Sequence, residues 1–301
     1  MAGDPGKNLT HQTAAQTWMS EEVHKIPAAY ITPEKYAMLH KVVIDACDEI
    51  DGVKDGVIEN PLQCKFDPGT LLCKGADGPD CLTQPQVDFV RTVYAGITSE
   101  TGKKIFPGLM PGSEGSWIGL AGQKPMGYAL DSYRYVVMKN PNWDYMTLDL
   151  DRDVAYADKT VASLVNNNDT DIKAFFARGG KLLAYHGWAD PGISPFNSID
   201  YYKDVAKEMG GVPKIDNEYR LFMIPGMLHC GGGDGTSNFD MIAAIDKWMD
   251  TGRAPDSILA SRVRNGMVDR TRPLCPFPKQ AVYKGSGGTD DAANFICTVK
   301  P

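Results

Sequence analysis

The sequence lacks a long hydrophobic run. Its apolar stretches, such as residues 182–185 and 221–225, are strand-sized and fall far short of the ~20 residues that a membrane-spanning helix needs. Residues 1–20 are polar and rich in Gly, Thr and Gln, without a basic start and an apolar centre, so no signal peptide is visible in this chain. We therefore expect no membrane partner.

An excess of basic residues is absent as well. The chain has 31 Lys and Arg against 38 Asp and Glu, a net charge of −7, and no basic run. Because nucleic-acid affinity comes largely from clustered Lys and Arg, we expect no nucleic-acid partner. With 43% hydrophobic residues among 301, the chain can form one large domain or two smaller ones with a real core.

The tight Cys-x-x-Cys spacing of zinc sites is missing too. Six of the seven cysteines form sequence-local candidate pairs, which are Cys47 with Cys64, Cys73 with Cys81, and Cys275 with Cys297. Such a set predicts disulfides and a secreted or periplasmic full-length protein, although seven reduced cysteines in a cytosolic protein are the alternative. Cys230 is left over. The odd cysteine and the missing signal peptide are both explained if an N-terminal part of the natural protein is absent from this chain.

Helix signals are clear at two places in the first half. Thr32 and Pro33 predict a helix start, followed by an apolar stripe from Met38 to Ala46. Thr83 with Gln86 forms a capping box before a helix that ends at Gly96. Residues 1–31 show no clear period, and residues 97–150, rich in Gly, Pro and aromatics, are typical of loops or a lid.

The second half alternates between helix and strand patterns. Helices are expected at 171–177, 196–209 and 239–249, and strands at 181–185 and 219–224. This alternation predicts a parallel α/β sheet with crossover helices. In the last helix, Ile242, Ile245, Trp248 and Met249 are expected to face inward.

Asp190 and His229 each follow a predicted strand by five residues, where reactive side chains of open α/β sheets lie. In the chain order Ser, Asp, His of α/β-hydrolases they would be the last two members. His229 would take and return the nucleophile's proton, and Asp190 would orient the imidazole. From these residues alone, a capping aspartate and a turn histidine explain the pattern as well. His186 is expected to be a packed histidine near Asp190.

The segments His186-Gly187-Trp188-Ala189-Asp190 and Leu228-His229-Cys230-Gly231-Gly232-Gly233 resemble tannases, feruloyl esterases and the related mono(2-hydroxyethyl) terephthalate hydrolase. The resemblance covers about Ala2 to Val299 and implies hydrolysis of aryl carboxylate esters, with a small aromatic ester as substrate. In that family the cysteine after the catalytic histidine is bonded to the cysteine before the nucleophilic serine. The resemblance therefore implies that the partner of Cys230 lies upstream of Met1.

The chain departs from this family in its nucleophile. Neither Cys-Ser-x-Gly-Gly nor Gly-x-Ser-x-Gly occurs, and Ser113, Ser194 and Ser286 match neither pattern although glycines are near. We expect the serine and the oxyanion-hole amides to be absent from this chain. One alternative is an active enzyme that recruits Ser194. Another is a non-catalytic truncated fragment that retains calcium binding and ligand or partner binding.

An acidic turn is the second candidate site. Three aspartates between residues 48 and 55, with Gly52 and Gly56 allowing tight curvature, suit a hard cation bound by oxygens, but the spacing is not that of an EF-hand. A solvated acidic turn is the alternative. The resemblance implies a structural Ca²⁺ in the lid. Its ligands would be the side chains of Asp48, Asp51 and Asp55 and the backbone carbonyls of Val53 and Val57.

Together these observations predict the C-terminal part of an α/β-hydrolase fold with an inserted calcium-binding lid domain. Residues 1–24 would be a remnant of the catalytic domain, 25–150 the lid, and 151–301 the rest of the catalytic domain. Trp117 and Ile193 are candidate walls of the substrate pocket, although aromatic clusters are more often plain core. A sheet without its earlier strands exposes apolar surface, so self-association through the sheet is expected.

Overall fold

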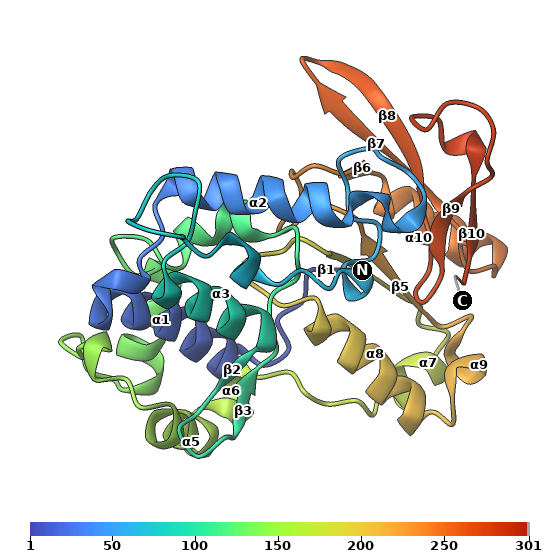
Figure 1. Cartoon of the computed structure of the whole chain (residues 1–301). Coiled ribbons are helices and arrows are strands. Elements are labelled where there is room, and N and C mark those ends of the chain that lie inside the picture. The colour runs from blue at the N-terminus through green and yellow to red at the C-terminus, as the bar shows by residue number, and fades with distance from the viewer. Residues whose placement is uncertain (300–301) are drawn as a thin grey trace.

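The computed structural model describes residues 1–299. Helices from the first half of the chain gather on one side of the molecule, and the sheet with the C-terminal strands forms the other side (Figure 1). The helices up to residue 165 are α1 (Leu9–Lys25), α2 (Pro33–Cys47), α3 (Gln84–Ala95), α4 (Gly127–Asp131), α5 (Leu150–Thr160) and α6 (Ala162–Val165). Short 3-10 or π turns connect them, namely η1 (Pro27–Ala29), η2 (Asp48–Asp51), η3 (Pro61–Gln63), η4 (Pro68–Leu71), η5 (Glu114–Gly119), η6 (Ser132–Val137) and η7 (Tyr145–Thr147).

The two helices expected in this half are confirmed. Helix α2 begins after Thr32, whose side chain accepts the backbone N–H of Lys35. Helix α3 begins with the predicted capping box and ends at Gly96. Leu39 and Val43 of α2 and Val90 of α3 are fully buried in one hydrophobic cluster.

Helix α1 lies where the sequence showed no period. Its buried residues are largely polar, and they include Gln12, Thr13, Gln16 and Thr17. The Thr13 and Thr17 hydroxyls donate to backbone carbonyls four residues earlier in the same helix, which satisfies them without an external partner. A helix that buries polar side chains has no apolar stripe, so hydrophobic periodicity could not detect it.

The central sheet has three parallel strands in the order β1 (Ala2–Gly3), β4 (Leu182–Gly187) and β5 (Tyr219–Ile224). Strand β5 has the predicted bounds. Strand β4 runs to Gly187, beyond its predicted end, so Asp190 follows the strand by three residues rather than five. The connecting helices are α7 (Lys173–Ala177), α8 (Phe196–Glu208) and α9 (Val212–Ile215).

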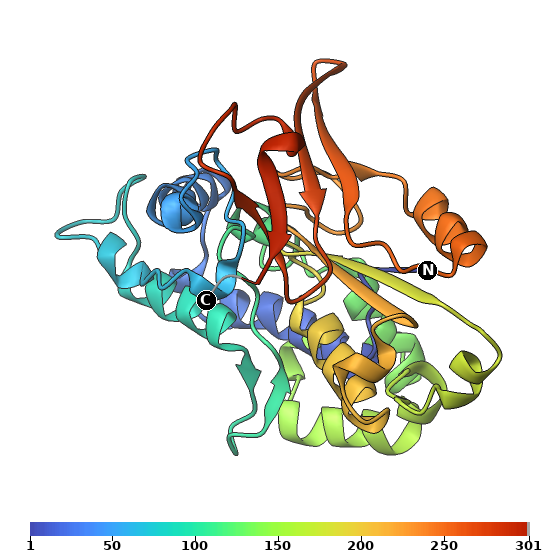
Figure 2. The same cartoon turned by 90° about the vertical axis from the view of Figure 1, so that its right-hand side faces the viewer.

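Both faces of this sheet are covered. Leu183 and Phe222 pack with Trp248 of α10 (Met241–Thr251), and alternate strand residues such as Leu221 pack with Tyr202 of α8. Figure 2 shows the two helices on opposite sides of the strands. The predicted inward face of α10 was wrong in part, because Ile242 and Met249 are 69% and 55% exposed. Met241 takes an inward place beside Trp248.

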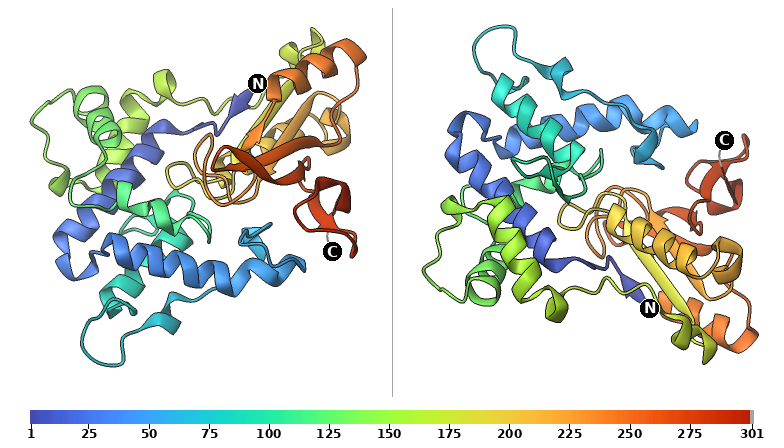
Figure 3. Two further views of the ribbon diagram at one scale, coloured as in Figure 1. Left: turned by 90° about the horizontal axis from the view of Figure 1, so that it is seen from above. Right: turned by 90° about the horizontal axis from the view of Figure 1, so that it is seen from below.

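Several short antiparallel strands escaped sequence analysis. They are β2 (Ile97–Thr98) with β3 (Lys104–Phe106), β6 (Asn238–Phe239) with β7 (Ile258–Arg264) and β8 (Met267–Leu274), and β9 (Gln280–Tyr283) with β10 (Phe295–Thr298), which follows η8 (Ala292–Asn294). Seen from above and below, the blue helix α2 extends toward the C-terminal strands (Figure 3). The pairing partners of these short antiparallel strands depend on tertiary packing, which no local pattern encodes.

The three predicted disulfides are present, and Cys230 is free and exposed. Within residues 1–299, no helix has the length and apolar character needed to cross a bilayer. Self-association remains a prediction, and so do the domain limits.

Candidate active site

Asp190 and His229 meet beyond the C-terminal ends of β4 and β5. The distance from Asp190 Oδ2 to His229 Nδ1 is 2.8 Å. Asp190 Oδ1 accepts the backbone N–H groups of Gly192 at 2.8 Å and Ile193 at 3.0 Å. Asp190 is fully buried, whereas the His229 side chain is 53% exposed. The carboxylate is therefore held rigidly, and the imidazole is accessible.

This contact decides which nitrogen of His229 carries the proton. A carboxylate only accepts, so Nδ1 donates and Nε2 keeps its lone pair. Burial alone would raise the pKa of Asp190, but hydrogen bonds from His186 and His229 outweigh it and lower the pKa to about 2. The hydrogen bond to Asp190 raises the pKa of His229, against the effect of burial. An ionised carboxylate behind a basic imidazole is suited to general-base catalysis.

The loop that carries His229 packs closely on the end of β4. A Cβ on Gly187 would lie 2.3 Å from the Met227 carbonyl oxygen, so only glycine permits this approach. Asp4, directly after β1, accepts the Gly187 N–H at 2.6 Å and the Cys230 N–H at 2.5 Å. Sequence analysis did not single out Asp4, although the rule that reactive residues follow strands would have found it.

A cavity of about 430 Å³ opens beside His229, within the usual size range of ligand sites. Its walls are Gln12, Gln16, Ser116, Gly119, Leu120, Met126, Tyr128, Pro191, Gly192, Ile193 and His229. Ile193, a candidate wall of the substrate pocket, lines this cavity. Trp117 does not line the cavity, because it is fully buried in the core of the N-terminal helices, where its ring contacts those of Tyr36 and Tyr94. The two glutamines were missed together with helix α1.

No hydroxyl group within residues 1–299 is hydrogen-bonded to His229. Ser194 is fully buried and donates to the Gly108 carbonyl at 2.6 Å, so its expected alternative role as a recruited nucleophile is wrong. Ser113 donates to the Met110 carbonyl at 2.6 Å. Burial, with Asp4 as a further cause, raises the pKa of the Cys230 thiol to about 11, which leaves little thiolate at neutral pH.

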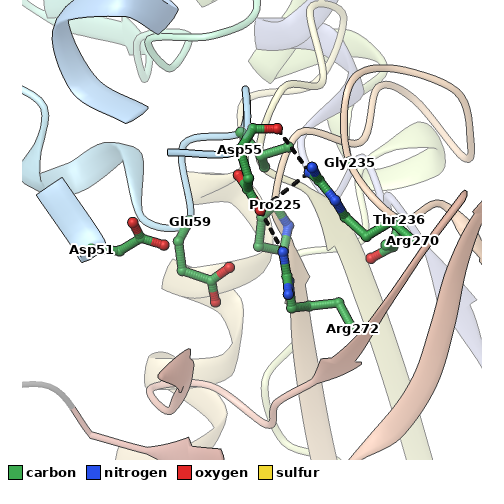
Figure 4. A pocket seen from close by; sticks show the side chains of 9 residues that line it. Asp51, Asp55, Glu59, Pro225, Gly235, Thr236, Arg270 and Arg272 are labelled. Atoms are coloured by element: carbon green, nitrogen blue, oxygen red, sulfur yellow. Dashed lines mark hydrogen bonds and ion pairs between the residues drawn. The ribbon is translucent and has the colours of Figure 1, made fainter. Parts of the chain in front are cut away.

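The acidic turn is folded around Asp48. Its carboxylate accepts the backbone N–H groups of Asp55, Gly56 and Val57 at 2.8 to 3.2 Å. The Asp55 carboxylate instead pairs with Arg270 at 3.1 Å and with Arg272 (Figure 4).

The sequence profile described as "Tannase and feruloyl esterase" matches residues 1–298. The chain belongs to this tannase and feruloyl esterase family. It is 33% identical to an uncharacterized esterase of Xanthomonas campestris pv. campestris, over 100% of this chain and 61% of that protein. It is 37% identical to a probable feruloyl esterase B-1 of Aspergillus flavus, over 89% of this chain and 55% of that protein.

Two solved structures support the assignment. An esterase from Aspergillus oryzae superposes with a TM-score of 0.92 at 34% identity, and feruloyl esterase B from Aspergillus oryzae with 0.89 at 32%. Each match covers 99% of this chain and 63% of the other. This tannase-family chain therefore spans less than two thirds of the length of these relatives.

The family resemblance implies a calcium site at the acidic turn. Carboxylate and carbonyl oxygens are the ligands that Ca²⁺ prefers. In the described arrangement, however, Asp51 and Asp55 line a space of about 10 Å³, roughly that of one water molecule, together with Arg270 and Arg272. Across residues 1–299, Asp48, Asp51 and Asp55 do not bring one carboxylate oxygen each within 4.8 Å of the other two. The turn forms a closed oxygen cage only if Asp55 leaves the two guanidinium groups that it faces.

Proposed function

We propose that this chain provides the acid–base pair and part of the substrate cavity of a carboxylic ester hydrolase that acts on aryl carboxylate esters. The contact of 2.8 Å between Asp190 and His229 at the C-terminal edge of the sheet carries the proposal. Membership of the tannase and feruloyl esterase family and the cavity beside His229 support it. The relatives' names supply the substrate class.

In the proposed reaction, His229 Nε2 accepts the proton of a serine hydroxyl while the serine oxygen attacks the ester carbonyl carbon. The imidazolium then returns that proton to the leaving alcohol as the ester C–O bond breaks. Water hydrolyses the acyl-serine through the same exchange, and Asp190 stabilises the imidazolium in both halves. The proposal takes the serine and the oxyanion-hole amides from a segment outside residues 1–301, because no described hydroxyl is bonded to His229.

Binding and hydrolysis are tested separately on the purified chain. We expect ferulate and gallate to shift the NMR signals of the His229 ring, whereas hexanoate, an aliphatic acid, does not. We expect hydrolysis of methyl ferulate and methyl gallate to stay at the level of a His229→Ala variant. Absence of any aromatic-specific shift would contradict the proposed function. Hydrolysis that disappears in His229→Ala would instead place a nucleophile within residues 1–301.

We also propose that residues 25–150 act as a lid over this cavity, in a secreted or periplasmic protein. The composition of the cavity walls supports this role for residues 25–150. Ser116, Leu120 and Tyr128 come from it, whereas Ile193 and His229 come from the sheet part. Three disulfides support an oxidising compartment.

Finally, we propose a structural Ca²⁺ at the acidic turn, which requires Asp55 to leave its arginine partners. At a free Ca²⁺ concentration of about one hundred times Kd, binding would stabilise the fold by about 2.7 kcal/mol. We expect calcium to raise Tm for the parent chain and for Asp45→Asn, an exposed control, but not for Asp51→Asn. Equal melting curves of the parent with calcium and with chelator would contradict the proposed calcium site.

A further inference from the structure

One histidine lies buried between two carboxylates. His186, in strand β4, is 0% exposed, as is Asp190, and Asp4 is 2% exposed. His186 Nε2 lies 3.4 Å from Asp190 Oδ2 and 3.7 Å from Asp4 Oδ1. These three residues come from two neighbouring strands and the turn after β4, and they all lie at the edge of the sheet where His229 stands.

The remaining contacts of His186 define its tautomer. Nε2 lies 3.0 Å from the Ile193 carbonyl oxygen, and Nδ1 lies 2.7 Å from Ser198 Oγ. Because a carbonyl oxygen only accepts, Nε2 carries a proton. That N–H donates to the Ile193 carbonyl oxygen, and Asp190 Oδ2 and Asp4 Oδ1 lie near the same nitrogen at the longer distances of 3.4 and 3.7 Å. The Ser198 contact fixes the plane of the ring from the opposite nitrogen.

Asp190 receives contacts on both of its oxygens. Oδ1 accepts two backbone N–H groups, and Oδ2 faces His229 Nδ1 at 2.8 Å and His186 Nε2 at 3.4 Å. A buried carboxylate is costly unless it is paired, and its orientation depends on every donor around it. Both histidines lower the pKa of Asp190 against the effect of burial.

Asp4 connects this histidine with the catalytic loop. One carboxylate oxygen accepts the Gly187 N–H and faces His186, and the other accepts the Cys230 N–H. Its backbone has φ = 38°, an uncommon value for a residue other than glycine, which indicates that the contacts of its side chain hold it there. Tyr185, His229 and Cys230 are the other titratable groups close to Asp4.

We propose that His186 is a positioning residue of the ester-hydrolase site, which holds Asp190 ionised and directed at His229, while Asp4 keeps His186 and the His229 loop in place. The inference rests on the proposed function, since it deepens the role of the same acid–base pair. His186 does not line the substrate cavity, so it acts only through Asp190.

The test is a carbon-13 NMR titration of the Asp190 carboxyl group in the full chain, which needs no turnover. We expect His186→Met, which lacks an N–H, to raise the pKa of Asp190 by about one unit or more, the size of ordinary environmental shifts. His186→Gln can place an amide N–H near the Nε2 position and should keep the parent value. His24→Met removes a histidine with two ring contacts far from Asp190 and serves as the control.

The outcomes separate positioning from packing. A parent-like pKa of Asp190 in His186→Met, or an equal rise in His186→Met and His186→Gln, would overturn the proposal. If His186→Met does not fold, as judged by near-UV circular dichroism, His186→Asn takes its place, because its shorter amide reaches the Nδ1 position and leaves Asp190 without the donor. Failure of aromatic acids to bind would count against the proposed function. The pKa of Asp190 could still be measured in the same chain, because its titration needs no ligand.

Discussion

At the scale of single residues, His40 of helix α2 connects Glu114 with the loop that follows His229. Its Nδ1 lies 3.2 Å from Glu114 Oε2 and its Nε2 lies 2.9 Å from Asp234 Oδ2. Asp234 follows the glycine-rich segment after His229. Hydrogen bonds to Asp234 first, and to Glu114 second, raise the pKa of His40 to about 10. A charged imidazole therefore bridges the two parts of the molecule at neutral pH.

The pKa of His40 predicts how stability depends on pH. A group whose pKa is higher in the folded state stabilises fully below its unfolded value, here about 6.5, and loses this contribution as pH rises through about 10. We expect this bridge to contribute roughly 2 kcal/mol, as hydrogen bonds to charged groups do. Denaturant unfolding from pH 6 to 10 measures it. His40→Gln should remove this dependence of the unfolding free energy on pH, and the control His24→Gln should keep it. Parallel pH profiles of the unfolding free energy for the parent and His40→Gln would contradict the assignment.

At the scale of elements, the capping box of α3 is also a tertiary contact. Gln86 Oε1 accepts the Thr83 N–H at 3.0 Å and the Lys35 ammonium at 3.0 Å, and Gln86 Nε2 donates to the Tyr30 carbonyl at 2.7 Å. The side chain is 4% exposed. Gln86 thus caps helix α3 and also forms hydrogen bonds to α2 and to the segment before α2.

Replacing Gln86 should cost more than the loss of an ordinary helix cap. Gln86→Leu leaves a buried carbonyl and a buried ammonium group without this partner, so we expect a loss of about 2 to 4 kcal/mol. Gln84→Ala, in the same turn but exposed, should change stability by less than about 0.5 kcal/mol. Urea unfolding of both variants measures the difference. Equal small losses would mean that the cap acts only locally.

At the scale of the whole molecule, the two edges of the sheet differ, because β5 forms one isolated bridge, from Phe222 to Pro276, on its outer side. Within residues 1–299, β1 pairs only with β4, and its other edge has no strand partner. The sequence predicted exposed faces as well, but α8 and α10 cover them. The unpaired outer edge of β1 is only two residues long, and both residues are partly buried.

An open edge of this kind favours pairing between copies. We expect concentration-dependent association of the chain in sedimentation velocity, together with a thermal transition of low cooperativity. A strictly monomeric species across the accessible concentrations, with a sharp and reversible melt, would show that the covered faces suffice for an independent fold.

Local chemistry determined what could be found in the sequence. The Thr32 and Thr83 caps and the β5 strand depend on neighbours a few residues away, and the members of the three cysteine pairs are separated by 8 to 22 positions, so their signals survive without knowledge of the fold. The placement of Asp190 and His229 follows from a rule that ties strand ends to one edge of a parallel sheet.

Tertiary structure alone decided the remaining features. Helix α1 buries polar residues, Trp117 lies in the core rather than on the cavity wall, and Asp55 faces arginines of a distant strand. His186 acquired its place between two carboxylates because β1 brings Asp4, 182 positions earlier in the chain, beside β4. Burial and charge pairing depend on which distant segments meet, and that information becomes visible only once the whole chain has folded.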